Sequence, residues 1–378
     1  MGFQTIIRAA LFSAALSVST IGPAMAERMN IERVGPTLPH PWGMDFLDDD
    51  TLLVTLRDGG LVRIAMDDGE ATDITGIPKV YSQRQGGLLD VAAADGQIYL
   101  CYSAILDGQS STAIDRALIK DNALVRRQTI FTGNNPTRSG HHFGCRLQLT
   151  NGMIYASLGD RGTRDIAQDP AAHAGSLIRI NLDGSIPDEN PNKAGWAPEI
   201  FTIGHRNPQG MEMHPRTGDI WIHEHGPRGG DEINIIRPDR DGGANYGWPT
   251  VSHGREYATG LRVSKHSSLS GYIDPAWVWI PSIAPSGMAF YPDAKGSNRT
   301  GSMFPEFQGH LLVGSLKFQR LYLVELGGES GLPNSERVIL DGEIGRIRDV
   351  AVAPHGLHAG AILLLSDEAQ GGLYMVKR

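Results

Sequence analysis

The sequence has few cysteines, few helix-length amphipathic segments and no surplus of basic residues. Its 378 residues include two cysteines, 34 lysines and arginines, and 42 aspartates and glutamates, which gives a formal net charge of −8. An acidic chain without a basic stripe argues against binding to nucleic acid or to anionic membrane surfaces. Neither cysteine has a redox CxxC neighbour, so we expect both to be structural.

Long apolar runs are also absent, and the one short run near the N-terminus has the features of an export signal. Arg8 gives the positive region, Ala9 to Leu16 the apolar core, and Ala24-Met25-Ala26 a small-x-small cleavage site. The run is too short to span a bilayer, and no cysteine for a lipid anchor follows it. We expect residues 1–26 to be a signal peptide, a mature chain that begins at Glu27, and a soluble periplasmic or secreted protein.

Cys101 and Cys145 each lie in a run that has the pattern of a strand, IYLCYS and CRLQL. In an oxidising compartment they could form a disulfide, and otherwise they would be two buried thiols. Their distance in the sequence does not decide between these alternatives.

Short apolar strands separated by Gly, Pro, Asn and Asp turns run through the whole chain. One sequence pattern recurs: a small turn residue, an apolar strand, a tight turn and a second apolar strand. It begins at Gly43, Gly87, Gly144, Gly210, Gly287 and near Arg348. Six copies at unequal spacing predict an all-β fold, a six-bladed β-propeller with four-stranded antiparallel blades.

A two-sheet sandwich is the competing fold, but it would not require the same two-strand sequence pattern six times. No low-complexity linker divides the chain, so we expect one domain over residues 27–378. The longest irregular insertions are Asp183 to Pro198 and Gly254 to Pro275, and we expect both to cap one end of the propeller channel.

The segment from Glu199 to Pro249 concentrates arginine, histidine and acidic residues among many Gly and Pro residues. Its alternating apolar runs, Asp219 to His223 and Asp231 to Ile236, predict two short strands. The polar groups fall mostly in the connections, where a rigid scaffold can aim side chains and backbone carbonyls at a ligand. The segment therefore predicts a ligand or metal site.

A histidine and a carboxylate fall at the two ends of one predicted strand pair. His141 and His142 come just before the third repeat, in SGHHFGCR, and Asp160 ends the next strand, in SLGD. An isolated histidine is more often a structural hydrogen-bonding group. A carboxylate placed to orient an imidazole instead favours a general base.

Cationic residues recur at equivalent points of successive repeats. Arg206 and Asn207 enter the fourth repeat, Lys317 ends a strand of the fifth, and Arg346 and Arg348 open the sixth. A single cation on a strand is usually solvated, but radial symmetry would bring these to one axial pocket. Such a pocket in an acidic protein predicts an anionic small ligand.

The HEHGPRGGDE segment contains possible metal ligands. Alternation places His223 and His225 on one face of a strand, and no helical HExxH zinc spacing occurs. The carbonyls of Gly226 and Pro227 beside Asp231 and Glu232 favour a hard cation such as calcium.

In these segments the chain resembles the soluble glucose/sorbosone dehydrogenase family, specifically its periplasmic aldose sugar dehydrogenase branch. The resemblance runs from about Pro39 to the C-terminus and rests on QGGLLD, HFGCRL, LGDRG, GHRNPQG, EHGPRGGDEIN, NYGWP, IAPSGM, SLK and RIRDV, in this order. It implies a six-bladed propeller that uses pyrroloquinoline quinone (PQQ) and calcium. It also implies oxidation of aldose sugars at the anomeric carbon to lactones, with hydride transfer to PQQ and an external electron acceptor.

The resemblance implies roles for individual residues. His142 matches the general base, with Arg146 at the expected offset, and Asp160 matches its carboxylate partner. Arg206 would also stabilise the developing oxyanion. The implied PQQ contacts are Gln85, Arg206, Asn207, Lys317, Arg346 and Arg348. The implied calcium ligands are the carbonyls of Gly226 and Pro227, with Asp231 and Tyr246 for a further structural calcium.

Two other functions stay open at this point. Calcium-dependent lactonases also use six-bladed propellers, although their chemistry needs side-chain oxygens and Asn around the metal rather than a ring of cations. A non-catalytic propeller that binds a sugar or a protein is the third reading. The sequence does not identify the preferred sugar or the electron acceptor, and it leaves open whether the protein is a monomer or a homodimer.

Overall fold

The computed structural model describes residues 29–293, 303–327 and 331–378. The expected signal peptide and its cleavage site before Glu27 therefore lie outside the described residues. Within them, no helix is both long enough and apolar enough to cross a membrane.

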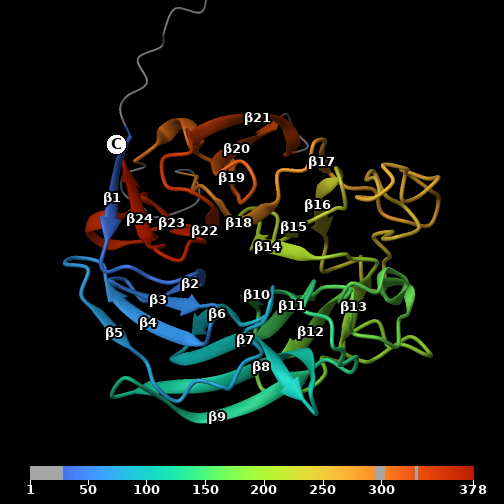
Figure 1. Ribbon diagram of the computed structural model, residues 1–378, viewed down its shortest axis with the longest axis horizontal. Coiled ribbons are helices and arrows are strands. Elements are labelled where there is room, and N and C mark those ends of the chain that lie inside the picture. The colour runs from blue at the N-terminus through green and yellow to red at the C-terminus, as the bar shows by residue number, and fades with distance from the viewer. Residues whose placement is uncertain (1–28, 294–302, 328–330) are drawn as a thin grey trace, which may run out of the picture.

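Six four-stranded antiparallel sheets are arranged around a central axis, as Figure 1 shows. Blades one to three are formed in chain order by β2 (Pro41–Asp48), β3 (Thr51–Leu56), β4 (Gly60–Ala65), β5 (Ala71–Asp73), β6 (Leu88–Ala94), β7 (Gln97–Leu106), β8 (Gln109–Lys120), β9 (Ala123–Thr132), β10 (Gly144–Thr150), β11 (Met153–Leu158), β12 (Ser176–Asn181) and β13 (Ile200–Ile203). The first strand of each blade lies nearest the axis.

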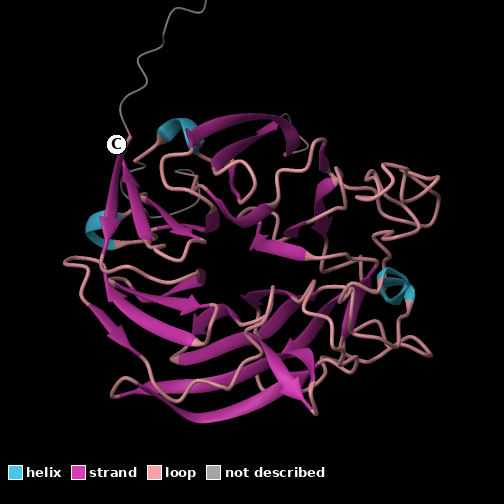
Figure 2. Cartoon of the chain, viewed as in Figure 1, coloured by secondary structure: helices cyan, strands magenta, loops and turns pink. Residues whose placement is uncertain are grey.

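Blades four to six repeat this order. They are formed by β14 (Pro208–Met213), β15 (Ile220–Glu224), β16 (Asp231–Ile236), β17 (Trp277–Trp279), β18 (Pro285–Phe290), β19 (Leu311–Ser315), β20 (Arg320–Gly327), β21 (Leu332–Asp341), β22 (Ile347–Val352), β23 (Ile362–Ser366), β24 (Leu373–Lys377) and β1 (Asn30–Val34). Strands dominate in Figure 2, and the described helices are short 3₁₀ turns: Arg164–Gln168, Pro305–Phe307 and Gly356–His358. The predicted all-β, six-bladed fold is confirmed.

The two ends of the described chain close the ring. Strand β1 completes the sixth blade by pairing with β24, with Asn30 opposite Lys377 and Val34 opposite Leu373 (Figure 1). The last blade is thus built from both ends of the chain, which removes the free edge that an open array would leave.

Apolar packing between blades forms the core. There are six buried clusters in the described chain, each joining two neighbouring blades. Between blades one and two, for example, Leu53 and Leu61 share a cluster with Leu88 and Ile98. Middle strands are covered on both faces, so they have continuous apolar runs such as LLV in β3 and ILLLS in β23 rather than strict alternation. A blade therefore depends on its two neighbours for burial.

The two cysteines form a disulfide between neighbouring blades. Cys101 of β7 is joined to Cys145 of β10, with 6.1 Å between their Cα atoms. The alternative of two free thiols, which the sequence left open, is not what the structure shows.

The two insertions do not cap the same end of the channel. The first begins after Asn181, which pairs with Met153 at the end of blade three away from Asp160. It packs on β12, since the Asn190 amide donates to the Arg179 carbonyl, and a second bond to the Pro198 carbonyl closes the insertion on itself. The second insertion lies at the opposite end, where Arg255 bridges to Arg228. The expectation of a joint cap is wrong because β12 runs away from that end.

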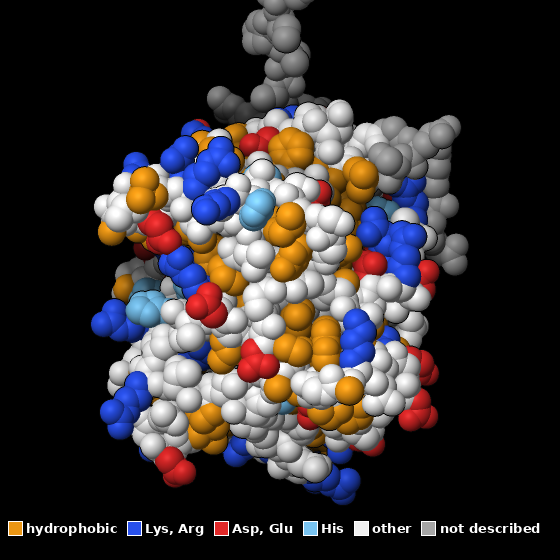
Figure 3. Space-filling model, turned by 90° about the vertical axis from the view of Figure 1, so that its right-hand side faces the viewer, with side chains coloured by type: hydrophobic (Ala, Val, Ile, Leu, Met, Phe, Trp, Pro, Cys, Tyr) orange, Lys and Arg blue, Asp and Glu red, His pale blue; other side chains and the backbone are white. Residues whose placement is uncertain are grey.

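Figure 3 shows the side of the molecule that carries blades three and four with their insertions. On this face, basic and acidic side chains are interspersed around bands of hydrophobic side chains. The cations described below are concentrated in a cavity and are not part of a basic field on this face.

Candidate functional site

The blade topology brings the predicted site residues to one end of the channel. In blade three, Gly144 at the start of β10 pairs with Leu158 at the end of β11. In blade six, Ile347 at the start of β22 pairs with Ser366 at the end of β23. Residues just before an innermost strand therefore lie near those just after a second strand. His142 meets Asp160 in this way.

His142 and Asp160 form a hydrogen-bonded pair. Nδ1 of His142 lies 2.6 Å from Oδ1 of Asp160, and the two side chains are 15% and 2% exposed. The backbone of His142 is left-handed, with φ of 49°. Gly159 permits this close approach, because a Cβ there would lie 2.2 Å from the His142 carbonyl oxygen. The side-chain oxygen of Gln85, which precedes blade two, accepts a hydrogen bond from the His142 amide at 2.7 Å. The neighbouring His141 is exposed.

The environment sets the protonation of this pair. Burial lowers the pKa of His142, and the positive charge of Arg206 lowers it further. The hydrogen bond to Asp160 raises this pKa but does not offset the other two effects. Burial opposes ionisation of Asp160, yet the hydrogen bond from His142 and the charge of Arg206 hold the pKa of this carboxyl below its usual range. We therefore assign a carboxylate that accepts the Nδ1 proton of a neutral imidazole, which leaves Nε2 with a free lone pair.

Two further donors hold Asp160. Its Oδ1 also accepts the amide of Gly162 at 2.7 Å, and its Oδ2 accepts the indole Nε1 proton of Trp248 at 2.8 Å. Trp248 is buried and comes from the loop between β16 and β17 in blade four. The carboxylate is thus fixed by groups from two blades.

Arg206 contacts the backbone of the segment in which calcium ligands were predicted. Its Nη1 donates to the carbonyls of His225 at 2.7 Å and Gly226 at 2.9 Å. The guanidinium carbon lies 5.1 Å from the centre of the Trp248 ring. Its Nε is buried and has no partner among the described residues. Burial lowers the pKa of Arg206, against the attraction of Asp160.

The turn that carries Arg206 and Asn207 is held by a buried glutamate. The carboxylate of Glu224 accepts both of their backbone amides, the second at 3.3 Å. The side-chain oxygen of Asn207 in turn accepts the amide of Gly144 at 3.2 Å. This explains how a Gly- and Pro-rich turn presents fixed polar groups.

A cationic cavity of about 430 Å³ lies beside the His142–Asp160 pair. Gln85, Asn207, Lys317, Arg346 and Arg348 line it, so the structure brings five of the predicted site residues together. Arg206, His142 and Asp160 are not among its lining residues. Charged side chains in the lining are five cations and one carboxylate: Arg57, Arg84, Lys317, Arg346, Arg348 and Asp367.

Asp367 is the internal counter-ion of this cavity. Its carboxylate lies 2.6 Å from Nη2 of Arg348, 3.6 Å from Nη2 of Arg346 and 3.1 Å from Nδ1 of His40. Burial opposes ionisation of Asp367, but the Arg348 guanidinium holds its pKa far below the usual range. Lys317 instead donates to the Ser282 carbonyl at 2.9 Å.

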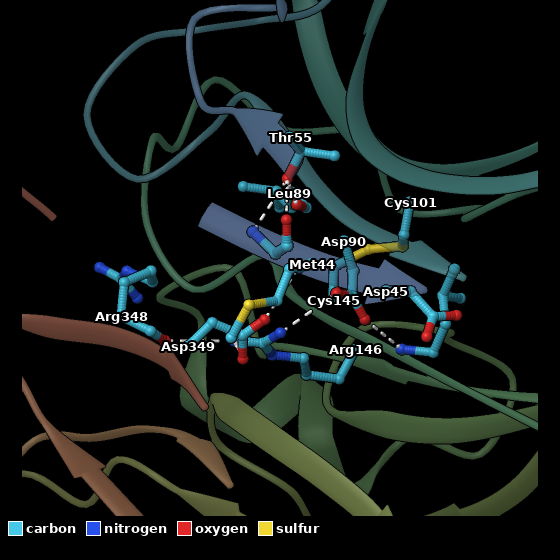
Figure 4. A network of polar contacts seen from close by, with 12 residues as sticks. Met44, Asp45, Thr55, Leu89, Asp90, Cys101, Cys145, Arg146, Arg348 and Asp349 are labelled. Atoms are coloured by element: carbon cyan, nitrogen blue, oxygen red, sulfur yellow. Dashed lines mark hydrogen bonds and ion pairs between the residues drawn. A yellow bond between two sulfur atoms is a disulfide. The ribbon is translucent and has the colours of Figure 1, made fainter. Parts of the chain in front are cut away.

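Figure 4 shows Arg146 together with the two aspartates that it contacts, Asp90 and Asp349. Its guanidinium is 3.1 Å from Asp90 and 2.9 Å from Asp349, and its Nε donates to the Gln209 carbonyl at 2.7 Å. Arg146 is 5% exposed. It is therefore a structural cross-link between innermost strands and not a group that faces the cavity.

Beyond Arg146 a second cavity of about 460 Å³ is lined by carboxyl groups. They are Asp45, Asp90, Glu212 and Asp349. Burial raises the pKa of Asp90 to about 7, and burial with repulsion from Asp45 raises that of Glu212 to about 8.

The structure does not bring the side chains of Asp231 and Tyr246 together. Asp231 starts β16, where its carboxylate accepts the amides of Gly226 and Ala284 at 2.9 Å and 2.8 Å. The Tyr246 hydroxyl donates to the carbonyl of Ile235, four residues along the same strand. At roughly 3.3 Å per residue these oxygens are on the order of 13 Å apart. The described residues also contain no group of three His, Cys, Asp or Glu side chains that could hold a metal.

Comparison with known proteins identifies the family. The profile of the family described as Glucose / Sorbosone dehydrogenase matches residues 38–375. The chain belongs to this family. The predicted resemblance is thus confirmed over nearly all of the described chain.

Individual aldose sugar dehydrogenases are similar over most of their length. Aldose sugar dehydrogenase YliI of Escherichia coli strain K12 is 36% identical over 363 residues, which cover 92% of each chain. The apo crystal structure of the soluble aldose sugar dehydrogenase from Escherichia coli superposes with a TM-score of 0.83 at 36% identity, covering 93% of this chain and 99% of that one. The PQQ-bound aldose sugar dehydrogenase of Streptomyces coelicolor superposes with a TM-score of 0.73 at 25% identity. The match covers 93% of this chain and 98% of that one.

In this member of the family, several site residues were missed by the sequence reasoning. Arg57 and Asp367 follow the second strands of blades one and six, the position that Asp160 has in blade three. The repeat could have identified both. Trp248 lies in a long loop outside the repeat, so periodicity gives no sign that its indole reaches Asp160.

Proposed function

We propose that the chain oxidises aldose sugars at the anomeric carbon to lactones, with PQQ bound in the cationic cavity and calcium beside it. The observation that carries this proposal is the hydrogen-bonded His142–Asp160 pair beside a cavity whose charged lining is mainly cationic. The family membership and the PQQ-bound relative support the same chemistry.

The residues of the cavity fit PQQ. This cofactor carries three carboxylates and an ortho-quinone, and the cavity has five cations against one carboxylate. The Nε groups of Arg57 and Arg348 are buried and have no partner among the described residues. Buried donors without acceptors are costly, so an anionic ligand that accepts their protons would stabilise the protein.

The fit to calcium rests on backbone oxygens. The Gly226 carbonyl accepts a hydrogen bond from the Arg206 guanidinium. The Pro227 carbonyl accepts a hydrogen bond from the Ser282 hydroxyl at 3.2 Å. Carbonyl oxygens are hard ligands of the kind calcium prefers. Asp231, which accepts the Gly226 amide, would keep this turn in place.

His142 is the proposed general base. Its Nδ1 proton is held by Asp160, so Nε2 would take the proton of the anomeric hydroxyl. Arg206, whose buried Nε has no partner in the described chain, would donate to the oxygen on which negative charge develops. When bound, PQQ would supply the acceptor for the hydride that leaves the anomeric carbon, and calcium would supply Lewis-acid polarisation of the reactive carbonyl.

The proposal includes an exported location and an external electron acceptor. The location rests on the N-terminal segment of the sequence, with its apolar core and cleavage site. The acceptor follows from the stoichiometry, because each oxidised sugar leaves two electrons that must be removed before the next turnover.

A reconstitution assay tests the function. Cofactor-free protein is mixed with an aldose and a redox dye, with PQQ, with calcium, with both or with neither. Dye reduction that requires both additions is the expected result. Lactone hydrolysis with calcium alone would instead identify a lactonase, and sugar binding without either reaction would identify a binding protein.

A further inference from the structure

Trp248 contacts two of the proposed catalytic groups at once. Its indole Nε1 donates to Oδ2 of Asp160 at 2.8 Å, and its ring lies under the guanidinium of Arg206, 5.1 Å from ring centre to carbon. The side chain is 7% exposed. The loop of blade four therefore reaches across to the residue that orients the base in blade three.

The position of Trp248 is itself fixed. Its amide donates to the Gly204 carbonyl at 3.0 Å, and its own carbonyl accepts Nε2 of Gln168 at 2.6 Å. The guanidinium carbon of Arg164, which pairs with Glu256 at 2.6 Å, is 5.8 Å from the ring centre. The backbone of Trp248 is thus fixed, and turning the indole would break its hydrogen bond to Asp160 and its ring contact with Arg206.

The two oxygens of Asp160 have different partners. Oδ1 accepts from His142 and from the Gly162 amide, whereas Oδ2 accepts from the indole, and no second donor to Oδ2 occurs in the described part of the chain. A buried carboxylate oxygen without a donor is costly. Without the indole proton, Asp160 would rotate or take up water, and its bond to His142 would change.

We propose that Trp248 is a positioning residue, whose indole N–H holds the Asp160 carboxylate in the orientation that directs His142 and whose ring holds Arg206 beside them. This inference rests on the proposed role of His142 as the base. It adds to that role a residue that acts on the base through Asp160 and sets the geometry and the proton affinity of the base.

The proton affinity of His142 should depend on this indole. A hydrogen bond to Oδ2 withdraws negative charge from the carboxylate, so its loss strengthens the attraction of Asp160 for an imidazolium. The pKa of His142 should then rise, and the acidic limb of kcat/KM should move to higher pH. Loss of packing alone would lower activity without moving that limb.

The test compares Trp248→Phe with Trp279→Phe. Trp279 is a matched control, because its indole also donates to a carboxylate, that of Glu336 at 2.5 Å, but lies outside the site. We expect Trp248→Phe to lower kcat roughly 10-fold with a KM within about threefold of wild type, and to raise the kinetic pKa by about 0.5–1. Trp279→Phe should leave the kinetic pKa unchanged.

A second readout needs no cofactor. NMR titration of the imidazole in cofactor-free protein, assigned by the signal that His142→Gln removes, should show the same upward shift in Trp248→Phe. If Trp248→Phe does not fold, benzothienylalanine at position 248 replaces the N–H by sulfur and keeps the ring. An unmoved pKa in both measurements, or an equal shift in Trp279→Phe, would overturn the inference.

The same variants separate this inference from the proposed function. If His142→Gln keeps the wild-type activity and acidic limb, the role of the base is wrong and the inference fails with it. If His142→Gln loses activity while Trp248→Phe leaves the pKa of His142 unchanged, the assignment of His142 as the base is kept and only the role of Trp248 is refuted.

Discussion

The guanidinium of Arg348 and the carboxylate of Asp367 lie 2.6 Å apart, with 9% and 8% of their side chains exposed. The cationic cavity thus contains its own anion before any ligand binds. An anionic cofactor would share Arg348 with Asp367. The Lys317 ammonium group instead donates to the Ser282 carbonyl and lies 4.8 Å from the centre of the Phe318 ring, and it has no carboxylate partner in the described residues. The two cations should therefore respond differently to removal.

Lys317→Ala should weaken PQQ binding by roughly 10- to 100-fold, because one charge-assisted contact is commonly worth about 1.5–3 kcal/mol. The free energy of unfolding of the cofactor-free protein should stay level, since this ammonium group is only loosely held. Fluorescence titration with PQQ and thermal unfolding measure the two quantities. Lys79→Ala, an exposed lysine outside the cavity, is the control.

Arg348→Ala should weaken PQQ binding to a similar extent and should also lower the free energy of unfolding by about 1–3 kcal/mol. The reason is that Asp367 stays buried with weaker partners. Unchanged dissociation constants in both variants would show that these cations do not converge on the cofactor.

His142→Ala should lower turnover roughly 10²-fold or more, because the substrate proton then has no base within the site. PQQ binding should be largely kept. His141→Ala, next to it but exposed and without a carboxylate partner in the described residues, should be much milder. Equal losses from the two substitutions would refute the assignment. Because burial holds the pKa of His142 below 6.5, wild-type activity should persist as pH falls to that value and decline only below it.

The sequence predicted the ring and the convergence of Asn207, Lys317 and Arg348 on one cavity, because both follow from a repeat that places equivalent positions at one end of the blades. It did not predict the neutralisation of Arg348 by Asp367. The sequence alone indicated a ring of unpaired cations, in which removal of one cation would reduce the repulsion among the others. Nor could spacing show that Tyr246 points to Ile235 rather than toward Asp231, since this depends on the path of an irregular loop.

Calcium removal tests the proposed metal at Gly226 and Pro227. Chelation should abolish dye reduction, and calcium together with PQQ should restore it, whereas zinc should restore it poorly because the proposed ligands are hard oxygens. Arg206 donates to the same Gly226 carbonyl, so Arg206→Ala should leave that oxygen free and should not weaken calcium binding. Isothermal titration in the presence of PQQ measures this affinity. Full activity in a rigorously calcium-depleted sample would exclude the metal from the reaction.

The carboxyl-lined cavity on the axis should make stability depend on pH. Glu212 has a pKa raised to about 8 in the folded protein, mainly by burial, from an unfolded value of 4.5. The folded state therefore keeps the proton that the unfolded state loses, so this group destabilises the protein progressively as pH rises from 4.5 to about 8. Glu212→Gln mimics the protonated form. It should match wild type near about pH 4 and exceed its free energy of unfolding by about 1–3 kcal/mol near about pH 9.

Denaturant unfolding of both proteins at the two pH values measures this difference, with Glu70→Gln, an exposed glutamate on blade one, as the control. The expected gain is well below the full value of the pKa shift, because the cavity is large enough to admit water around Glu212. Asp45 and Asp349 also repel the charged form of Glu212, so part of the gain reflects relief of this repulsion. A gain that is equal at both pH values would mean that the substitution acts through packing, and the raised pKa of Glu212 would have to be abandoned.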